Sequence, residues 1–390
     1  MPTLETSAPP KPARLLALDV FRGLTIALMI TVNNPGSWDH IYAPFEHANW
    51  NGCTPTDWVF PFFLFIVGVS AWFSLKKYNN RPTNDVYLKI WRRGATIFLI
   101  GLALNTFLIS APDYSHLRIL GVLQRIGIAY AIGSTLCVAL PRKYLALVGA
   151  FTLLGYWALL FHYSDPVYPY AHETADHKIE ALDNNLTVKV DKYILGENHL
   201  WKGKGLPFDP EGLVSAIPAI VTVILGFFLG FLIDATSNRS ILVRQMAAFG
   251  LTGMALGWFW GLAFPINKSL WTSSYVLYTA GIATIFIALL VYVIDVLDKK
   301  FWIKPALIFG MNSILAFVLS GVWVKVLTKI KFADSTGKKS NVLQLFYHNV
   351  VMPIGGGDNE FSSLIYALSH VLIFWLILWV FYKKGIFLKV

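Results

Sequence analysis

The chain has 390 residues, of which 56% are hydrophobic, 15% aromatic and only 14% charged, and its mean hydropathy is +0.56. Soluble domains contain about 45–50% apolar residues, so this composition excludes an ordinary water-soluble protein and predicts an integral membrane protein. The formal net charge of +10 would favour nucleic-acid binding only if the basic residues gathered on one surface, and their distribution along the chain indicates another cause.

Hydrophobic runs long enough to cross a bilayer, about 20 residues for a helix, recur along the whole chain. We expect ten spans, at 15–34, 58–75, 95–112, 121–140, 144–162, 213–233, 246–265, 273–297, 305–327 and 364–382. The predicted fold is all-α, a single polytopic membrane domain over residues 15–390 with about ten transmembrane helices. Residues 1–14, MPTLETSAPPKPAR, lack the features of a cleaved signal peptide, and their prolines predict a disordered cytoplasmic tail.

The orientation in the membrane follows from the basic residues, because Lys and Arg in short loops are held on the cytoplasmic side. Most of the 32 Lys and Arg residues lie in or beside segments that share a side with the N-terminus. The short loops on the other side hold only Arg118 and Lys268. Both termini are therefore predicted to be cytoplasmic, and the net charge is explained by topology rather than by a nucleic-acid partner.

Three outer segments, 35–56, 163–212 and 328–360, are long enough to form structure of their own. In the second, the alternation in LTVKV (186–190) and KYIL (192–195) predicts a small β-hairpin. The third is polar and rich in glycine, which favours an ordinary loop over a lid.

Neither of the two cysteines, Cys53 and Cys137, belongs to a CxxC motif or to a Cys/His cluster with zinc spacing, and the chain has no HExxH motif. A metal site is therefore not expected. The glycine run 355–357 lacks the Lys and Ser/Thr of a phosphate-binding loop, so we expect a flexible turn there.

Charged residues inside the first span are expensive in a bilayer, about 2.5–3.5 kcal/mol each near the helix centre. Asp19 and Arg22 lie three residues apart and so share a helical face, where they form either an ion pair or part of a functional site. Asn33 follows Asp19 by fourteen residues and falls on the same face, about 21 Å further along the axis. One polar stripe would then cross the membrane, although Asn33 could also simply cap the helix.

His47 and Asp57 come directly before the second span. The sequence Thr54-Pro55-Thr56-Asp57 fits a capping box, which alone would explain the aspartate. Asp57 also follows His47 by ten residues, and a carboxylate beside a histidine can hold the ring in one tautomer, as in a catalytic triad. The two interpretations carry equal weight, and one aspartate can serve both, although a lone loop histidine is usually solvated.

Arg125, in GVLQRIG, lies just inside the outer end of the fourth predicted span, beside Gln124. The guanidinium keeps its charge, so it requires a carboxylate, backbone carbonyls or an anionic ligand as partner.

Several motifs in the same order resemble the transmembrane acetyltransferase family of heparan-alpha-glucosaminide N-acetyltransferase and its bacterial homologues. They are LDVFRG (18–23), VNNPG (32–36), HANWNG (47–52), TDWVFPFFLFIVG (56–68), RILGVLQRIGIAY (118–130), FDPEGLVSAIPAI (208–220), PINKSLWTSSYVL (265–277), GMNSILAFV (310–318) and the C-terminal KKGIFLKV. The likeness covers nearly the whole membrane region.

The resemblance implies that acetyl passes from cytoplasmic acetyl-CoA to the amine of an amino sugar on the far side of the membrane. His47 matches the catalytic histidine of the family, and Asn33 matches the asparagine beside it. The chemistry of the residues agrees, because a histidine can take a proton from an attacking amine or accept the acetyl group itself. Asn33 would donate to the developing oxyanion, and Asp57 would orient the imidazole ring.

Because acetyl-CoA cannot cross a bilayer, its nucleotide is expected at the inner mouth of the protein. The candidate cofactor-binding residues are Asp19, Arg22, Arg92, Arg93, Arg239 and Arg244, with Lys76 and Lys77 as further basic candidates. The candidate acceptor-binding residues are Asn49, Arg118, Gln124 and Arg125.

The chain begins almost directly at the first span, which resembles the bacterial members of the family, so a bacterial inner, or plasma, membrane is the expected location. The acceptor, an amino sugar or a glycan, stays open, as do O-acetylation, an acetyl-histidine intermediate and a homodimer. The rival interpretation is an amino-sugar permease. Against it, the sequence shows neither an inverted repeat nor paired broken helices.

Overall fold

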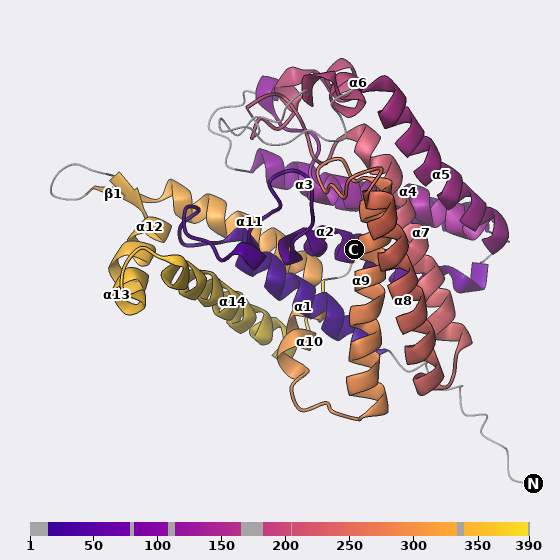
Figure 1. Cartoon of the computed structure of the whole chain (residues 1–390). Coiled ribbons are helices and arrows are strands. Elements are labelled where there is room, and N and C mark those ends of the chain that lie inside the picture. The colour runs from indigo at the N-terminus through magenta and orange to yellow at the C-terminus, as the bar shows by residue number, and fades with distance from the viewer. Residues whose placement is uncertain are drawn as a thin grey trace, which may run out of the picture.

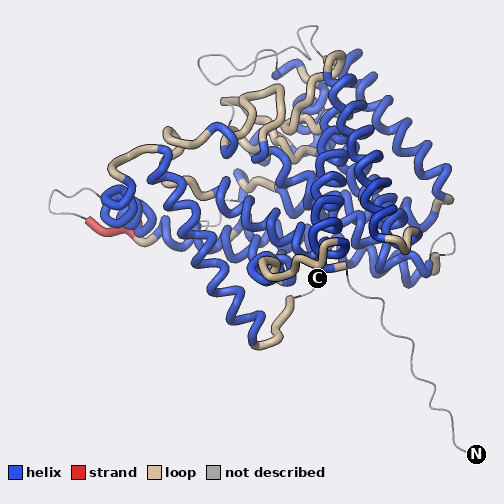
Figure 2. The backbone as a smooth tube through the Cα atoms, turned by 60° about the horizontal axis from the view of Figure 1, so that its bottom comes forward, coloured by secondary structure: helices blue, strands red, loops and turns tan. Residues whose placement is uncertain are grey.

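The computed structural model describes residues 15–78, 82–107, 114–164, 182–203, 205–333 and 339–388, so the predicted tail at 1–14 lies outside the described residues. The described chain is mostly helical (Figure 2). Eight long helices form the main bundle: α1 (Leu16–Asn33), α2 (Val59–Leu75), α3 (Asn84–Thr106), α4 (Val122–Ala139), α5 (Arg142–Tyr163), α7 (Leu213–Ala235), α8 (Arg239–Gly261) and α9 (Ser273–Val291). The all-α fold is therefore confirmed.

Each predicted span overlaps a described helix, but fewer helices than ten satisfy a strict test of length and hydropathy. Seven helices among the described residues are long and apolar enough to cross a membrane, and a bent pair of helices can supply an eighth. Helices α3 and α8 are not in that set. Lys89, Arg92 and Arg93 place three charges in the first half of α3. The protein is thus a polytopic helical membrane protein, and the count of ten spans stays a prediction.

The long helices alternate in direction and bring one set of loops to a common end of the bundle, called here the His47 end. Helices α1, α3, α5 and α8 finish there, and α2, α4, α7 and α9 begin there. The loop between α8 and α9 lies at this upper end in Figure 1, whereas the loop between α9 and α10 lies at the lower end. Arg142 begins α5 and Arg239 begins α8, so both lie at the opposite end of the bundle from His47. This is the end at which the basic residues were predicted to face the cytoplasm.

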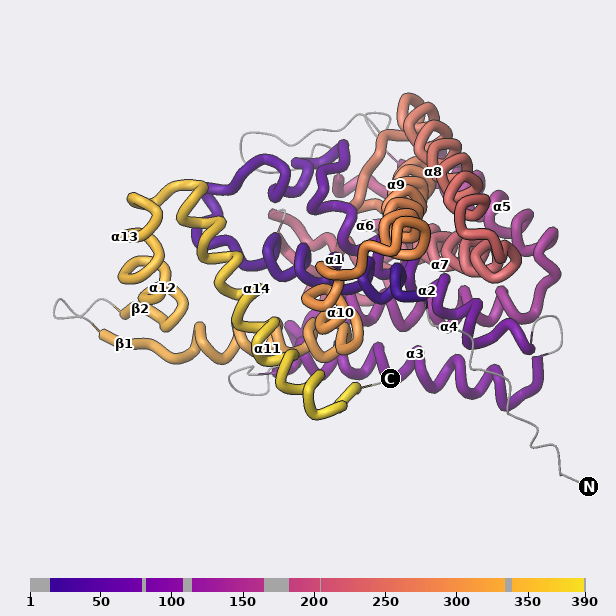
Figure 3. Tube along the Cα trace, turned by 90° about the horizontal axis from the view of Figure 1, so that it is seen from below, coloured from indigo at the N-terminus to yellow at the C-terminus, as the bar shows by residue number. Residues whose placement is uncertain are grey.

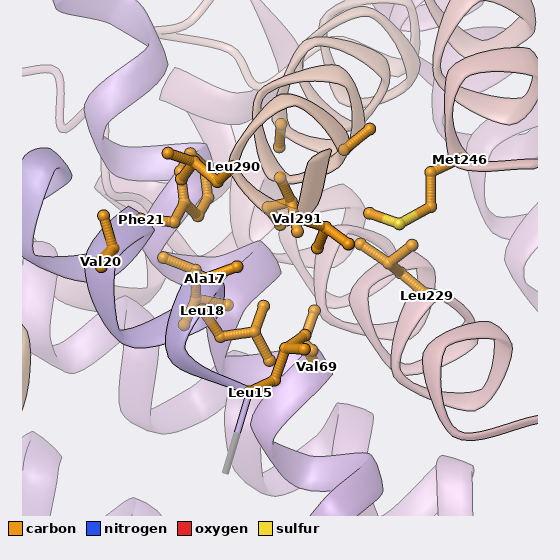
Figure 4. Close-up of a cluster of buried hydrophobic side chains, with 14 of the residues drawn as sticks. Leu15, Ala17, Leu18, Val20, Phe21, Val69, Leu229, Met246, Leu290 and Val291 are labelled. Carbon is orange, nitrogen blue, oxygen red and sulfur yellow. The ribbon is translucent and has the colours of Figure 1, made fainter. Parts of the chain in front are cut away.

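The core is built where α1, α2, α7, α8 and α9 meet (Figure 4). Phe21 of α1, Val69 of α2, Leu229 of α7, Met246 of α8 and Val291 of α9 all belong to one buried cluster. A helix that is apolar around most of its circumference belongs in a bundle interior or a membrane span, and α2, α7 and α9 fit that description. Helices α7 and α9 pack against α2 and so hold its start, and hence Asp57, in a fixed position.

Helices α2 and α7 approach closely through glycine. A Cβ atom on Gly68 would lie 2.0 Å from the Val223 carbonyl oxygen, and one on Gly226 would lie 2.0 Å from the Phe65 carbonyl oxygen. Small residues allow this kind of backbone contact between membrane helices. The pair therefore depends on glycine at both positions.

Gly68→Ala is expected to destabilise the protein by about 1–3 kcal/mol, because overpacking forces the two backbones apart. The matched control is Gly155→Ala in α5, where an added Cβ meets nothing within 4 Å. Thermal unfolding in detergent should show a lower midpoint for Gly68→Ala and an unchanged or slightly higher one for the control. Equal midpoints for the two variants would contradict the close contact.

A second group of helices packs beside α1 (Figure 3): α10 (Lys304–Met311), α11 (Ser313–Lys329) and α14 (Glu360–Lys383). Helices α10 and α11 form the bent pair, with an 80° change of direction at Asn312. The Asn312 amide donates to the Ile386 carbonyl at 3.1 Å and its carbonyl accepts from Leu388 N at 3.1 Å, which ties the bend to the C-terminal segment. The part of the chain that the structure describes contains one such bent pair, so the paired broken helices of many transporters are not found there.

The predicted hairpin in the segment 163–212 is wrong. Residues Leu186–Leu195 form helix α6, which begins at Asn185, whose side chain accepts from Thr187 N at 3.0 Å, and ends at Gly196 with φ of 80°. The alternation of LTVKV misled because Thr187, Val188 and Asp191 are the buried residues of α6, and their spacing is helical rather than alternating.

Short strands occur instead in the third outer segment, where β1 (Lys331–Ala333) pairs antiparallel with β2 (Lys339–Asn341). They lead into the short helices α12 (Val342–Phe346) and α13 (Met352–Gly355), which are separated by a π-helical turn. This segment is therefore more regular than the loop that the sequence favoured. The glycine run after α13 does form a turn, with φ of 82° at Gly356 and 127° at Gly357.

Candidate active site

The loop that carries His47 is fixed at both of its ends. At its start, the buried Asn34 donates to the Ile30 carbonyl at 2.8 Å, and Gly36 N donates to Ser363 of α14. At its end, residues Pro55–Trp58 form a 3₁₀ turn that continues into α2. These contacts hold the loop against the bundle rather than leaving it in solvent.

The predicted capping box is confirmed. The Asp57 carboxylate accepts from Thr54 N at 3.0 Å and from the Thr54 hydroxyl at 3.1 Å, both through Oδ2. The same Oδ2 accepts from Ala48 N at 3.1 Å, so the carboxylate also fixes the backbone next to His47.

Asp57 also contacts the histidine, as the second interpretation of the sequence required. His47 Nδ1 lies 2.7 Å from Asp57 Oδ1, and the side chains are 50% and 2% exposed, respectively. A carboxylate in this position accepts the Nδ1 proton and leaves the lone pair of Nε2 available. One oxygen of the aspartate therefore caps the helix start while the other orients a half-exposed imidazole.

Lys268 is the neighbour of His47 that sequence reasoning missed. Its Nζ lies 3.1 Å from His47 Nδ1, 3.3 Å from His47 Nε2 and 3.6 Å from Asp57 Oδ1. Burial lowers the pKa of Lys268, and the nearby Asp57 carboxylate opposes that effect. The signal was present in the sequence, since Lys268 was one of two basic residues in the short outer loops. Nothing in the sequence indicated that Lys268 contacts His47, which lies 221 residues earlier in the chain.

The loop between α8 and α9 is tied to the His47 loop by hydrogen bonds. The buried Asn267 donates to the Trp50 carbonyl at 3.0 Å and to Asn51 Oδ1 at 3.1 Å. Gly52 N donates to the Ile266 carbonyl at 2.7 Å. These bonds hold the loop that contains Lys268 next to the His47 imidazole.

Tyr275, in the first turn of α9, donates its hydroxyl proton to the Asp57 backbone carbonyl at 2.6 Å. The side chain is fully buried and packs edge-on against Trp271. The position of Asp57 is thus set from α2 and from α9 together.

The predicted acceptor residue Arg118 has protein partners. It forms a two-pronged contact with Asp209, at 2.8 Å from Nε and 2.7 Å from an Nη nitrogen, and pairs with Glu211 at 2.5 Å. Paired contacts of this kind are strong and directional. The Glu211 carboxylate also opposes the lowering of the pKa of Lys268 by burial.

Arg125 is 1% exposed, and one of its Nη nitrogens finds its partners within the protein, whereas its buried Nε has none among the described residues. Its guanidinium donates to the Pro210 carbonyl at 2.6 Å, to the Gly212 carbonyl at 3.3 Å and to the Ser215 hydroxyl, and it lies 5.1 Å from the Trp271 ring centre. Backbone carbonyls were one of the three partners considered from the sequence, and two of them bind Arg125 together with the Ser215 hydroxyl.

The other two predicted acceptor residues differ in their surroundings. The Gln124 side chain is buried and donates to the Ile119 carbonyl at 3.0 Å. Asn49 is exposed in the His47 loop. Of the predicted acceptor residues, Asn49 is therefore the one that is exposed, two residues along the chain from His47.

Asp191 of α6 lies beside the same ion cluster. Its Oδ1 accepts from Leu213 N at 3.0 Å at the start of α7, and burial raises the pKa of its carboxyl group to about 6. A carboxyl whose pKa is raised in the folded state adds stability below its unfolded pKa and loses that contribution as the pH rises through about 6.

Lowering the pH from 7 to 5 should therefore stabilise the wild type by roughly 1 kcal/mol relative to Asp191→Asn, whose side chain stays neutral. Unfolding midpoints of both proteins at the two pH values measure this difference. A constant gap between the two midpoints would contradict the raised pKa.

Asn33 lies at the end of α1 and is exposed. Val32 and Val59 share a buried cluster, which places the end of α1 near the start of α2. Within the described part of the chain, however, the Asn33 side chain makes no hydrogen bond to His47 or Asp57. Its role stays a prediction.

The predicted cofactor residues do not form one cluster. Asp19 and Arg22 form the expected ion pair at 2.9 Å, and Arg22 also donates to Ser70 of α2 at 3.0 Å. The remaining candidates, Arg92 and Arg93 on α3 and Arg239 and Arg244 on α8, lie nearer the end of the bundle opposite His47. No group of metal-ligating side chains occurs among residues whose positions are described.

Comparison with known proteins fits this arrangement. Residues 14–261 match the profile of the family described as "Heparan-alpha-glucosaminide N-acetyltransferase, catalytic", a stretch that includes His47 and Asp57 and ends before Lys268. The chain is 30% identical to heparan-alpha-glucosaminide N-acetyltransferase of Homo sapiens over 362 residues, covering 79% of this chain and 52% of that protein. It is 28% identical to the Mus musculus protein of the same name over 430 residues, covering 97% of this chain and 60% of that protein.

The chain thus spans between half and two thirds of the length of these curated relatives. The profile match covers more than half of the chain itself and contains the whole His47 loop. The chain belongs to the catalytic family of heparan-alpha-glucosaminide N-acetyltransferase.

Proposed function

We propose that this protein is a membrane acetyltransferase that moves the acetyl group of acetyl-CoA to the amine of an amino sugar at the His47 end of the bundle. The observation that carries the proposal is the 2.7 Å contact between the half-exposed His47 ring and the buried Asp57 carboxylate. Membership of the family named for this transfer supports it.

The geometry suits general-base catalysis. With its Nδ1 proton held by Asp57, the His47 ring presents Nε2 toward an acceptor, and imidazole exchanges protons near neutral pH. The buried carboxylate stabilises the imidazolium that forms when the acceptor amine gives up a proton. An acetyl-histidine intermediate would use the same nitrogen as nucleophile.

On the acceptor side, Asn49 is the residue proposed to contact the sugar, because it is exposed and belongs to the same loop as His47. Arg118, Gln124 and Arg125 have internal partners, so their proposed role is to shape the wall of the acceptor site. The names of the human and mouse relatives specify a glucosaminide, and an amino sugar is proposed here on that basis.

On the donor side, the nucleotide of acetyl-CoA is proposed to stay at the end of the bundle that carries the basic helix starts, with both termini on that cytoplasmic side. Arg22 is the best placed of the candidates to meet the pantetheine arm, because it lies inside the bundle between α1 and α2. Asp19 would hold Arg22 in place. Arg92, Arg93, Arg239 and Arg244 are the proposed phosphate contacts, and a bacterial plasma membrane is the proposed location.

Transfer of radiolabelled acetyl from acetyl-CoA by the purified protein in nanodiscs tests the proposal, with glucosamine and a panel of amino sugars as acceptors. The expected product is an N-acetylated sugar formed in step with the release of CoA. Absence of both products with every acceptor would contradict the proposal, and uptake of amino sugars into proteoliposomes would then support the permease interpretation.

A further inference from the structure

Lys268 lies beside both ring nitrogens of His47. Its Nζ is 3.1 Å from Nδ1 and 3.3 Å from Nε2, and in the tautomer set by Asp57 the lone pair is on Nε2. A cationic donor therefore lies within about one hydrogen-bond length of the nitrogen that the proposed mechanism uses as base.

The position of Lys268 is fixed by its backbone more than by its side chain. The adjacent Asn267 is 1% exposed and holds the loop through Trp50 and Asn51. The Lys268 side chain itself is 24% exposed. A lysine head group on such an anchored stem can move by a small distance without changing the loop.

We propose that Lys268 is a catalytic residue that binds the carbonyl oxygen of the acetyl thioester and stabilises the oxyanion formed during transfer. The inference rests on the proposed function and deepens it. Reacting atoms approach to about 3–3.5 Å before attack, so an acetyl group brought beside Nε2 comes within reach of an ammonium that already contacts this nitrogen. A site that lies about 3 Å from both the base and the oxyanion donor is what acyl transfer requires.

The proposed step transfers the acetyl group from the thioester sulfur to the acceptor nitrogen. The acceptor amine attacks the thioester carbon, a C–N bond forms, and the π electrons of the carbonyl move to oxygen, where the Lys268 ammonium neutralises the charge. His47 Nε2 takes the proton from the attacking nitrogen. The oxyanion then collapses, the C–S bond breaks, and the proton passes from His47 to the departing CoA thiolate.

The surrounding charges suit this role. Asp57 Oδ1 lies 3.6 Å from Nζ, and Glu211, His47 and Cys53 are the other titratable groups near it. Burial lowers the pKa of Lys268 and the Asp57 and Glu211 carboxylates oppose that effect, and a preorganised donor in a site of low polarity stabilises an oxyanion more than the same donor does in water. Asn33, which the sequence nominated for this task, makes no hydrogen bond to His47 in the described chain.

Steady-state kinetics of Lys268→Met and Lys268→Arg, with acetyl-CoA and the best acceptor in nanodiscs, test the inference. Lys268→Met should lower kcat by about 10²–10³-fold and change the KM for acetyl-CoA by less than about twofold, because the contact strengthens only as charge develops. Lys268→Arg keeps the charge and should recover part of the loss. Lys189→Met, which removes an exposed charge on α6, is the matched control and should behave as wild type.

A second donor separates oxyanion binding from simple support of the imidazole. Fluoroacetyl-CoA has an activated carbonyl carbon, so its reaction depends less on oxyanion stabilisation. The fold reduction in kcat caused by Lys268→Met should therefore be smaller with fluoroacetyl-CoA than with acetyl-CoA. Equal losses with both donors, or a Lys268→Met activity within about threefold of wild type, would overturn the inference while leaving the acetyltransferase intact. An inactive wild type would instead remove the proposed function and this inference together.

Loss of folded protein is excluded by measuring acetyl-CoA binding and the unfolding midpoint of each variant. If Lys268→Met does not fold, Lys268→Gln carries the same comparison of donors.

Discussion

Replacing His47 with alanine is expected to reduce acetyl transfer by about 10²–10⁴-fold, the range that general-base catalysis contributes. The substitution removes the nitrogen that accepts the acceptor proton, and it leaves the Asp57 carboxylate bonded to Thr54 and Ala48. Initial rates of CoA release and of product formation measure the loss.

His40→Ala is the matched control for this prediction, because His40 belongs to the same loop and forms none of the contacts described at the site. It should transfer acetyl at the wild-type rate. A His47→Ala variant that keeps more than about a tenth of the wild-type kcat would contradict a chemical role for the ring.

Asp57→Asn is expected to lower kcat by about 10²–10⁴-fold, because an amide neither stabilises the imidazolium nor selects the tautomer that leaves Nε2 free. The asparagine can still accept one of the capping hydrogen bonds, so the loss of stability should be limited to about 1 kcal/mol. Kinetics and thermal unfolding of the same preparation separate the two effects.

The complementary variant is Thr54→Val, which removes the hydroxyl bonded to Asp57 and to the Glu46 carbonyl while leaving the contact with His47. It should lower the unfolding midpoint and change kcat little. If Asp57→Asn and Thr54→Val lose activity in proportion to stability, the aspartate serves as a cap alone.

Much of the local structure could be predicted from the sequence because its causes are local. The capping box needs only residues 54–57, and the Asp19–Arg22 ion pair needs only a helix. Hydrophobic length marked each long helix, since a bilayer demands about 20 apolar residues whatever the tertiary packing. His47 and Asp57 are ten residues apart, one in a loop and the other at a helix start. Their contact could therefore be predicted from the sequence only as one of two interpretations of Asp57.

The parts of the site that could not be predicted from the sequence depend on contacts between distant segments. Lys268 reaches His47 across 221 residues, and Arg118 finds Asp209 across 91. The FDPEG sequence was noted for its resemblance to the family, but its carboxylates gave no sign that they bind Arg118. Pairings of this kind arise only when the helices are packed.

Helix α6 shows a different limit. Its ten residues include the β-branched Thr187, Val188 and Val190, and apolar and polar residues alternate around them. This pattern is typical of a strand. The cap formed by Asn185 and the burial of Asp191 against the start of α7 decide for a helix. A local cap and a tertiary contact together thus outweigh the preference of these residues for a strand.

Transfer across a sealed membrane tests the central claim most directly. Proteoliposomes with the His47 end of the protein facing the lumen would hold the amino sugar inside, and radiolabelled acetyl-CoA would be added outside. The account predicts acetylated sugar inside the vesicles and free CoA outside, with neither product from His47→Ala. Acetylation that occurs only when donor and acceptor share one compartment would contradict a site that receives acetyl from the opposite side of the membrane.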